Sequence, residues 1–373
     1  MIEIIIYLAA ILIFGLRSVL FCIGAYKERN RLLPTNDTRY FPFVSVVIPA
    51  RNEEENIERC INSIFINTYP ADKYEVIAVN DRSEDKTGEI LNRLQQDYKT
   101  LKIISIDDES AHNNLKGKPR ALQCGIEAAE GSVIMMTDAD CVVNNKWIET
   151  MAQAYSNENV GLVASFTTII GNKIFEKIQA VEWIYMHTMG SGGIGLNEPL
   201  GCYGNNLSVR KDEFIKLGGY EKIRFSVTED LALLQAVYKS GRTVRYFPNY
   251  NMSVETLPCK NLLEYFNQRH RWAIGGLSLG WRGAVFVITS FALWVGIITS
   301  LITCQPLWLL AVVVSRILGD YAVITPSLNI LKKYKLGFWV IPSVLFFIIA
   351  EAIVPFLLLN KEIVWKGQIF RKH

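Results

Sequence analysis

The chain has 373 residues, of which 50% are hydrophobic and 20% are charged, and its mean hydropathy is +0.19. A soluble domain of this length seldom averages above zero, so the composition excludes a disordered chain and argues against an ordinary cytosolic enzyme. The net charge of +3, from 39 basic and 36 acidic residues, is too balanced for a protein dedicated to binding nucleic acid. The seven cysteines lack metal-binding spacing, which indicates reduced thiols and a soluble part that faces a reducing compartment.

Apolar residues are concentrated at the two ends of the chain. A membrane-spanning helix needs about 20 predominantly apolar residues. Ile2–Ala25 meets this condition, and it lacks a basic leader and a small-residue cleavage site, so we predict an anchor and not a removed signal peptide. Three more spans are predicted near the C-terminus, over Ala284–Cys304, Leu307–Ile324 and Phe338–Leu359.

Three ionisable residues interrupt the last two spans, namely Arg316, Asp320 and Glu351. A charge at that depth is costly, so we expect these side chains to face protein or a wet cavity, with Arg316 paired to Asp320.

Basic residues indicate which loops face the cytoplasm. Lys27, Arg29 and Arg31 follow the first span, so the positive-inside rule predicts that the next loop, and with it the soluble middle of the chain, lies in the cytoplasm. The chain is therefore predicted to be an integral membrane protein, of the plasma membrane if it is bacterial. Residues 360–373 form a basic tail, which four complete crossings would place outside. Either the tail violates the rule or the segment around Pro355 is re-entrant, and the sequence leaves both open.

Residues 43–280 are predicted to form one α/β domain with its own core. Short apolar runs predict strands at Val44–Ile48, Tyr74–Val79, Leu101–Ile106 and Ser132–Thr137, of which the first and the last are expected to be buried. Helical patterns lie between them at Asn52–Ile66, Ser83–Leu94 and Lys118–Ala129. This alternation predicts a doubly wound, mostly parallel sheet that binds its ligands at the carboxyl ends of the strands.

Two amphipathic segments, at about 173–188 and 261–280, are predicted to lie at the membrane interface, although the first could instead pack on the sheet. Gly190-Ser-Gly-Gly-Ile-Gly195 matches the dinucleotide-binding pattern GxGxxG, which needs a strand before it and a helix after it. Here a helix precedes the glycines, so we predict a flexible loop and not a nicotinamide site.

Carboxylates follow two of the predicted strands where each one ends. Asp81 ends the second strand, and Asp138 and Asp140 follow the fourth. Alternate residues beyond a strand end can bring two carboxylates to one point, and oxygen ligands suit Mg²⁺ or Mn²⁺. A solvated turn is the alternative for this DxD. Asp81 could accept a hydrogen bond from a base or ribose, and Ser83 is a candidate helix N-cap.

Basic residues mark the start of a predicted helix at Lys116-Gly-Lys118-Pro-Arg120. Pro119 suits the first helical turn. The helix dipole disfavours cations at this end, and a bound phosphate would remove the conflict. The alternative is a solvated basic turn.

Two later segments also combine polar groups with an apolar helical pattern. Glu229 and Asp230 precede an apolar helical run. They could form the start of a capped helix, or they could supply a carboxylate that acts as a general base. Gln268 and Arg271 share a helix face beside Trp272, where Arg could hold a diphosphate and Trp could stack on a sugar. The alternative for the second segment is a membrane-surface helix.

In their order and spacing, these elements resemble the membrane-bound family-2 glycosyltransferases of the GT-A fold. That group includes ceramide glucosyltransferases and the processive cellulose, chitin and hyaluronan synthases. Its pattern of Asp, DxD, (T)ED and QxxRW appears here as Asp81, Asp138-Ala-Asp140, Thr228-Glu-Asp230 and Gln268-Arg-His-Arg271-Trp272. The resemblance covers residues 43–280 and implies a GT-A α/β domain joined to about four transmembrane helices, with Mg²⁺ or Mn²⁺ as cofactor.

The resemblance also implies roles for individual residues. Asp230 would be the general base, and Asp140 would ligate the metal. The nucleotide-sugar side would comprise Pro49, Arg51, Glu53, Asp81, Lys118, Asp138, Gln268, Arg271 and Trp272. The acceptor side would comprise Gly204, Asn205, Asn206 and Glu229. Family members of this kind invert the anomeric centre.

The number of spans bears on the acceptor. A processive synthase must move a polar polymer through a channel of several helices, and three spans after the catalytic region are few. A lipid acceptor with its hydroxyl at the cytoplasmic interface needs no channel. We therefore predict transfer from a UDP-sugar to a membrane lipid. Processive polysaccharide synthesis is the main alternative, followed by glycosylation of a polyprenyl phosphate and by a non-catalytic sensor of sugar nucleotides.

Overall fold

The computed structural model describes residues 1–31, 40–106, 115, 117–223, 226–360, 362–365 and 368–371. Lys116 lies outside the described residues, as do Lys361, Lys366 and Lys372 of the basic tail. The chain divides into two compact units. The membrane unit consists of Met1–Asn30, Gly171–Leu200 and Cys259–Ile363, and the sheet unit consists of Arg31–Ile170, Gly201–Pro258 and Val364–His373.

This division differs from the single domain predicted over residues 43–280. The two amphipathic segments fall in the membrane unit, and the strands and their covering helices fall in the sheet unit. Helix packing explains the difference, because the helix formed by the first amphipathic segment packs on three membrane helices.

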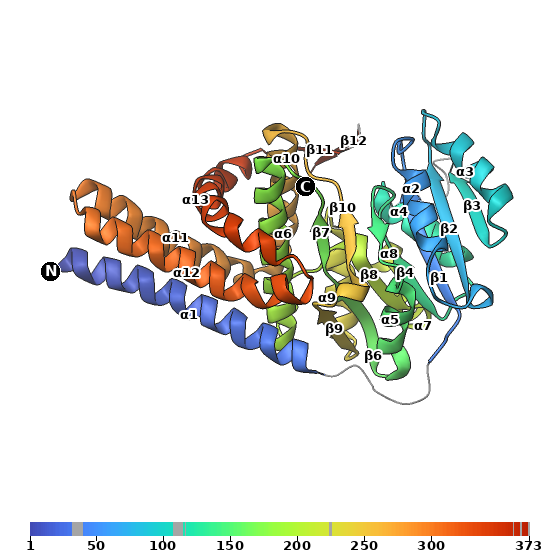
Figure 1. The fold of residues 1–373 in the computed structure, drawn as a ribbon, viewed down its shortest axis with the longest axis horizontal. Helices are drawn as coiled ribbons and strands as arrows, with labels where there is room; N and C mark the ends of the chain where they lie inside the picture. The colour runs from blue at the N-terminus through green and yellow to red at the C-terminus, as the bar shows by residue number, and fades with distance from the viewer. Residues whose placement is uncertain are drawn as a thin grey trace. The chain divides into compact units, whose positions relative to one another are not determined.

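A seven-stranded sheet forms the centre of the sheet unit, in the order β3-β2-β1-β4-β8-β6-β9 (Figure 1). Six strands run parallel, and β8 is antiparallel to both of its neighbours. The strands are β1 (Val44–Ala50), β2 (Tyr74–Asp81), β3 (Leu101–Ile106), β4 (Val133–Met136), β6 (Val160–Ser165), β8 (Leu207–Arg210) and β9 (Thr243–Phe247). The predicted doubly wound, mostly parallel sheet is confirmed, and β1 and β4 are buried along almost their whole length, as expected for strands covered on both faces.

Helices and shorter strands complete the sheet unit. The helices are α2 (Ile57–Phe65), α3 (Thr87–Asp97), α4 (Lys118–Ala128), α5 (Trp147–Gln153), α7 (Lys211–Lys216), α8 (Gly219–Lys222) and α9 (Glu229–Lys239). A small sheet has the order β5-β10-β7, formed by Val142–Val143, Val254–Thr256 and Thr167–Ile169. The last strands, β11 (Glu362–Trp365) and β12 (Gln368–Arg371), pair with each other.

Two predicted helix starts are wrong because polar side chains hold the preceding loops. The helix expected from Asn52 begins at Ile57, and the helix expected from Ser83 begins at Thr87. Asn52 has a left-handed backbone, with φ of 53°, and its N–H donates to Ser83 Oγ at 3.0 Å. Ser83 therefore links two loops and does not cap a helix.

Six helices form the body of the membrane unit. They are α1 (Ile2–Asn30), α6 (Ile174–Gly195), α10 (Leu262–Gly276), α11 (Trp281–Ile302), α12 (Pro306–Ile330) and α13 (Val340–Leu357). Within the described part of the chain, four segments are long and apolar enough to cross a membrane: Ile2–Asn30, Trp281–Ile302, Pro306–Ile330 and Tyr334–Leu357. In Figure 1, α1, α11 and α12 run side by side and α6 crosses them, and α6 packs on α1, α12 and α13.

The glycines of the GxGxxG match belong to helix α6, so the prediction of a flexible loop is wrong. They allow α1 and α6 to approach until their backbones touch. A Cβ atom on Gly195 would lie 1.9 Å from the Gly24 carbonyl oxygen, and one on Gly24 would lie 2.0 Å from the Gly192 oxygen. Small residues at such a crossing permit close packing between apolar helices.

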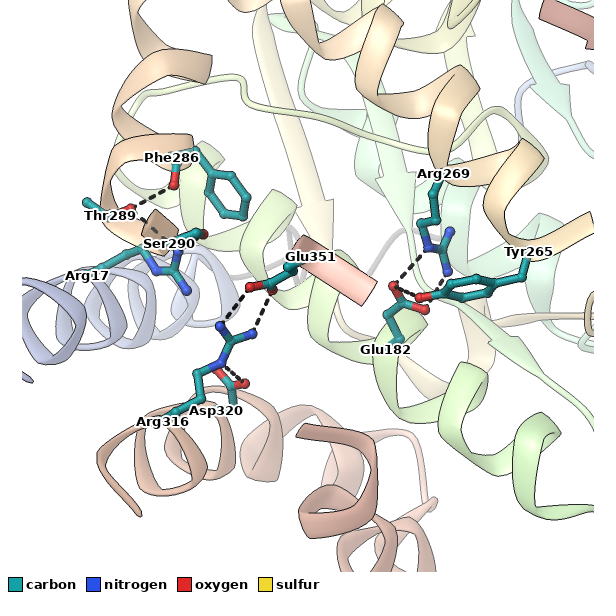
Figure 2. Close-up of polar contacts among 10 residues, drawn as sticks. All are labelled: Arg17, Glu182, Tyr265, Arg269, Phe286, Thr289, Ser290, Arg316, Asp320 and Glu351. Carbon is teal, nitrogen blue, oxygen red and sulfur yellow. Dashed lines mark hydrogen bonds and ion pairs between the residues drawn. The ribbon is translucent and has the colours of Figure 1, made fainter. Parts of the chain in front are cut away.

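The charged residues in the last two spans face protein, as predicted (Figure 2). Arg316 is 1% exposed, and its Nε donates to Asp320 Oδ2 at 2.7 Å. Its two terminal nitrogens donate to Glu351 at 2.9 and 2.7 Å. The expected pair of Arg316 with Asp320 is therefore confirmed, and Glu351 completes it. Arg17 of α1 separately donates to Ser290 Oγ of α11 at 2.7 Å.

Candidate active site

The carboxyl ends of the parallel strands hold several of the predicted site residues. Strand β1 pairs with β2 on one side and with β4 on the other, so the chain changes direction across the sheet at β1. In doubly wound sheets, ligands bind at such a switch point, outside the strand ends. Pro49 lies within the end of β1, Asp81 ends β2, and Asp138 follows β4.

Four charged side chains meet near this edge, and we call Lys118, Asp138, Glu229 and Asp230 the acid cluster. Lys118 Nζ lies 2.6 Å from Asp138 Oδ1 and 3.1 Å from Glu229 Oε1. Lys118 starts α4, Asp138 follows β4, and Glu229 and Asp230 start α9. The structure thus brings together residues that are up to 112 positions apart, which is 230 minus 118.

Lys118 shows how the cluster offsets an unfavourable helix position. The residue before it, Gly117, has φ of 65°, a backbone conformation that glycine adopts without steric cost. Burial by itself would lower the pKa of Lys118, but the carboxylates of Asp138 and Glu229 outweigh it and raise that pKa above its usual value. The ammonium group is therefore charged, and the alternative of a solvated basic turn is wrong, because only 13% of the side chain is exposed.

Asp230 is fixed by backbone donors from two elements. Its Oδ2 accepts a hydrogen bond from the Gly204 N–H at 2.8 Å, and its Oδ1 accepts one from the Leu231 N–H at 2.7 Å. A Cβ atom on Gly204 would lie 3.2 Å from both Glu229 Oε1 and Lys118 Nζ, so glycine gives the cluster room to form.

Burial and the neighbouring Glu229 carboxylate raise the pKa of Asp230 to about 6, against the opposing effect of Lys118 and the two N–H donors. A carboxylate with a pKa near the working pH is well matched to accepting a proton during a reaction. Such a shift beside a charge partner is typical of functional sites.

Asn205 and Asn206 follow Gly204, and their side chains are committed to internal hydrogen bonds. Asn205 Oδ1 accepts from Thr167 Oγ1 at 2.9 Å. Asn206 Oδ1 accepts from Trp147 Nε1 at 3.0 Å, and its Nδ2 donates to two backbone carbonyls. In this structure the two side chains anchor the loop that presents Gly204, and their expected place on the acceptor side stays a prediction.

Arg51 and Glu53 lie in the loop after β1, and Asp81 is the last residue of β2. Asp81 is 4% exposed, and its Oδ1 accepts a hydrogen bond from Arg82 Nε at 2.9 Å. The Glu53 N–H donates to Thr87 Oγ1 at 2.8 Å.

Sequence reasoning missed the residues that cross-link the loops after β1 and β2, namely Asn52, Glu54, Asp85 and Thr87. Their side chains accept backbone N–H groups of the other loop at 2.8 to 3.0 Å, so the two loops form one rigid piece. The density of short polar residues after both strands was the available signal.

The metal prediction rests on Asp138 and Asp140. Across the described residues, no group of three or more His, Cys, Asp and Glu side chains is arranged to hold a metal ion. Mg²⁺ needs fewer protein ligands than that, because it commonly binds through one or two carboxylates together with substrate phosphates. Two partly exposed carboxylates at a strand end therefore fit a cation that arrives with a nucleotide.

The QxxRW segment lies on α10 in the membrane unit. Gln268 Oε1 accepts a hydrogen bond from Arg269 Nη1 at 3.0 Å, and Trp272 packs edge-to-face on Trp183 with ring centroids 5.5 Å apart. The buried arginine of this segment is Arg269, 7% exposed, which the sequence did not single out.

A model of glycosyl transferase family 21 matches residues 6–373 of this chain. The chain belongs to glycosyl transferase family 21. This confirms the predicted relationship to the membrane-bound glycosyltransferases that include ceramide glucosyltransferases.

Curated relatives agree with the family 21 membership. The probable glycosyltransferase YdaM of Bacillus subtilis (strain 168) is 31% identical over 271 residues, which cover 71% of this chain and 60% of YdaM. A beta-monoglucosyldiacylglycerol synthase of Trichormus variabilis is 28% identical over 278 residues, which cover 72% of this chain and 56% of the synthase. The family 21 chain thus spans 60% or less of the length of these relatives.

A solved structure confirms the GT-A fold. The mannosyltransferase PcManGT from Pyrobaculum calidifontis, in complex with GDP-Man and Mn²⁺, superimposes with a TM-score of 0.60 at 14% sequence identity. The match covers 94% of this chain and 99% of PcManGT. At this identity the likeness concerns the fold alone.

Proposed function

We propose that this protein transfers a sugar, with inversion, from a UDP-sugar to the hydroxyl group of a membrane lipid, and so makes a glycolipid. The observation that carries the proposal is the acid cluster, in which a buried Asp230 with a raised pKa lies beside a charged Lys118. Family 21 membership and the relatives named as beta-monoglucosyldiacylglycerol synthases support the choice of a lipid acceptor.

Asp230 supplies the base in this proposal. A lipid hydroxyl is a poor nucleophile, so a carboxylate must take its proton as the oxygen attacks the anomeric carbon. The hydrogen bonds from Gly204 and Leu231 hold the Asp230 carboxylate in place, while burial keeps it basic enough to accept that proton. Direct attack with a single base inverts the anomeric centre.

Lys118 and Asp140 act on the leaving group. The diphosphate gains negative charge as the bond to the sugar breaks, and the Lys118 ammonium stabilises that charge electrostatically. Asp140 would ligate Mg²⁺ or Mn²⁺ which, when bound, supplies further positive charge to the diphosphate. Asp138 keeps Lys118 in position through the 2.6 Å contact.

The remaining assignments rest on the family resemblance. Pro49, Arg51, Glu53 and Asp81 surround the nucleoside in this proposal, and the rigid pair of loops supports it by fixing the backbone there. By the same resemblance, Gln268, Arg271 and Trp272 would bind the donor diphosphate and shape the acceptor opening. Glu229 and Gly204 lie on the acceptor side.

The membrane unit gives the proposal its setting. Four helices of suitable length and composition would hold the protein in the bilayer. In this proposal the sheet unit faces the cytoplasm, and the basic residues after the first span support that orientation through the positive-inside rule.

The proposal is tested by incubating the purified full-length protein with radiolabelled UDP-sugars and a total lipid extract. We expect label to enter the organic phase in a product that mass spectrometry identifies as a glycolipid. Label in an insoluble polymer would instead indicate a polysaccharide synthase. No transfer with any donor would contradict the proposal and favour a non-catalytic sensor.

A further inference from the structure

Glu182, Tyr265 and Arg269 form a buried polar contact between α6 and α10, which we call the α6 clamp (Figure 2). Glu182 Oε1 accepts hydrogen bonds from Tyr265 Oη and Arg269 Nε, both at 2.9 Å. Glu182 Oε2 accepts a further bond from Arg269 Nη2. The guanidinium thus meets the carboxylate in a bidentate arrangement, which fixes direction as well as distance.

Arg269 passes this fixed geometry to two residues of the QxxRW segment. Its remaining terminal nitrogen, Nη1, donates to Gln268 Oε1 at 3.0 Å. Its guanidinium carbon lies 4.2 Å from the ring centroid of Trp272 and 4.4 Å from that of Tyr265. A planar guanidinium held between two rings restrains both of them. The orientations of Gln268 and Trp272 therefore depend on where Arg269 points.

Neighbouring residues on the same face of α6 reinforce this contact. Gln179, one turn before Glu182, exchanges two hydrogen bonds with the backbone of Cys259, at 3.1 and 2.8 Å. The Cys259 thiol in turn points at Gln268 Oε1, 3.7 Å away. Trp183 packs against Trp272. One face of α6 thus holds both ends of the QxxRW segment.

Stability by itself does not account for the α6 clamp. Two charges lose their hydration when they are buried as a pair, and a well-packed apolar pair is often as stable or more so. What the ion pair adds is a directional contact that apolar side chains cannot provide. Gln268 and Trp272, whose orientation this contact fixes, belong to the segment that the proposed function assigns to the donor diphosphate.

We infer that Glu182 is a positioning residue of the transfer reaction, which acts through Arg269 to hold Gln268 and Trp272 in the orientation that receives the donor diphosphate. This inference rests on the proposed function. In this role Glu182 does not contact substrate, and the positive charge of Arg269 is neutralised by Glu182 inside the protein.

The test compares two variants of the full-length protein in lipid nanodiscs. Glu182→Gln leaves the Arg269 charge without its partner, and Glu182→Leu with Arg269→Met replaces both charges with apolar side chains. We expect kcat for UDP-sugar turnover to fall about 10- to 100-fold in both, as is usual when reacting groups lose alignment. We expect the dissociation constant for UDP with Mn²⁺ to rise several-fold, with the acceptor KM unchanged.

The double variant separates positioning from folding. Its apolar pair should restore the thermal stability that Glu182→Gln loses, while kcat stays low. Glu182→Asp keeps the charge and should recover part of kcat. Glu198→Gln is the matched control, since it removes a carboxylate that pairs with Arg282 in the same unit, away from the QxxRW segment; it should leave both kcat and UDP binding within twofold.

The double variant can also contradict the inference. Wild-type kcat and UDP affinity in that variant would show that the α6 clamp only packs the two helices. A wild-type protein that binds UDP but transfers no sugar would contradict the proposed function, whereas weakened UDP binding in Glu182→Gln would still support the positioning role.

Discussion

The acid cluster of the sheet unit and the α6 clamp of the membrane unit differ in their balance of charge. In the sheet unit, the acid cluster sets one ammonium group against three carboxylates, which leaves two negative charges in excess when all are ionised. In the membrane unit, Arg269 is matched by Glu182, and its charge is neutralised within the pair.

The second buried group of the membrane unit also approaches neutrality. Arg316 meets Asp320 and Glu351, and the nearby Arg17 adds a second positive charge, so two cations face two carboxylates. A balanced group holds its members in place through its ion pairs and so fixes geometry. An unbalanced group keeps a carboxylate that can take up a proton or a cation, which is what a reaction needs.

Removal of the Asp230 charge from the acid cluster should have the largest effect, which is a loss of catalytic turnover. Asp230→Asn keeps the size of the side chain but cannot accept the acceptor proton, so kcat should fall about 10² to 10⁴-fold. UDP affinity, measured by calorimetry, should change by less than about threefold. The matched control is Asp212→Asn, because Asp212 accepts the N–H of the next residue at 2.8 Å as Asp230 does, but it is exposed. Full activity in Asp230→Asn would show that another group is the base.

Loss of balance in the membrane unit should reduce stability. Arg316→Leu removes the direct ion-pair partner of the buried Asp320 and the partly buried Glu351, which should cost about 3 to 5 kcal/mol in the free energy of unfolding. Thermal unfolding in detergent measures this. Arg282→Leu breaks a half-exposed ion pair and should cost about 1 kcal/mol or less. Equal losses in the two variants would mean that the buried group adds no stability beyond that of a surface pair.

A variant of Asp140 tests whether the carboxylates at this edge of the sheet unit bind a cation. In Asp140→Ala, the dissociation constant for UDP in the presence of Mn²⁺ should rise at least about tenfold, because a metal ligand is lost. With EDTA present, wild type and variant should bind UDP equally weakly. A Mn²⁺-independent affinity in the wild type would argue that Lys118 acts on the diphosphate without a metal.

The smallest expected effect concerns pH. Asp230 must be ionised to act as a base, so kcat/KM should fall below about pH 6 and rise to a plateau above it. Glu229 raises the pKa of Asp230, so Glu229→Gln should move this acidic limb to lower pH, by about one unit. Profiles of kcat/KM between pH 4.5 and 8.5 would show it. A limb that moves to higher pH would mean that Glu229 acts mainly through Lys118.

Much of the fold followed from local pattern. Buried runs such as Val44–Ile48 form strands as predicted, because a short apolar run between helices is stable inside a parallel sheet that is covered on both faces. Helix ends were harder to predict. Ser83 satisfies the rule for an N-cap, but Asn52 of another loop takes its oxygen, and no local rule contains that residue.

The site divides in the same way. The sequence by itself predicted which residues carry the chemistry, because Asp81, the DxD, the Glu229–Asp230 pair and QxxRW keep a fixed order along the chain. It also determined that four segments are long and apolar enough to cross a membrane, since length and composition decide that.

Only the tertiary structure decided the partners of these residues. It pairs Lys118 with Asp138 and Glu229. It brings the Gly204 N–H to the Asp230 carboxylate, and it pairs Glu182 of α6 with Arg269 inside the QxxRW segment. It also turned a glycine-rich run into a helix crossing, because Gly195 meets Gly24 far away in the chain. Burial and hydrogen bonding depend on neighbours in space, and sequence patterns report mainly neighbours along the chain.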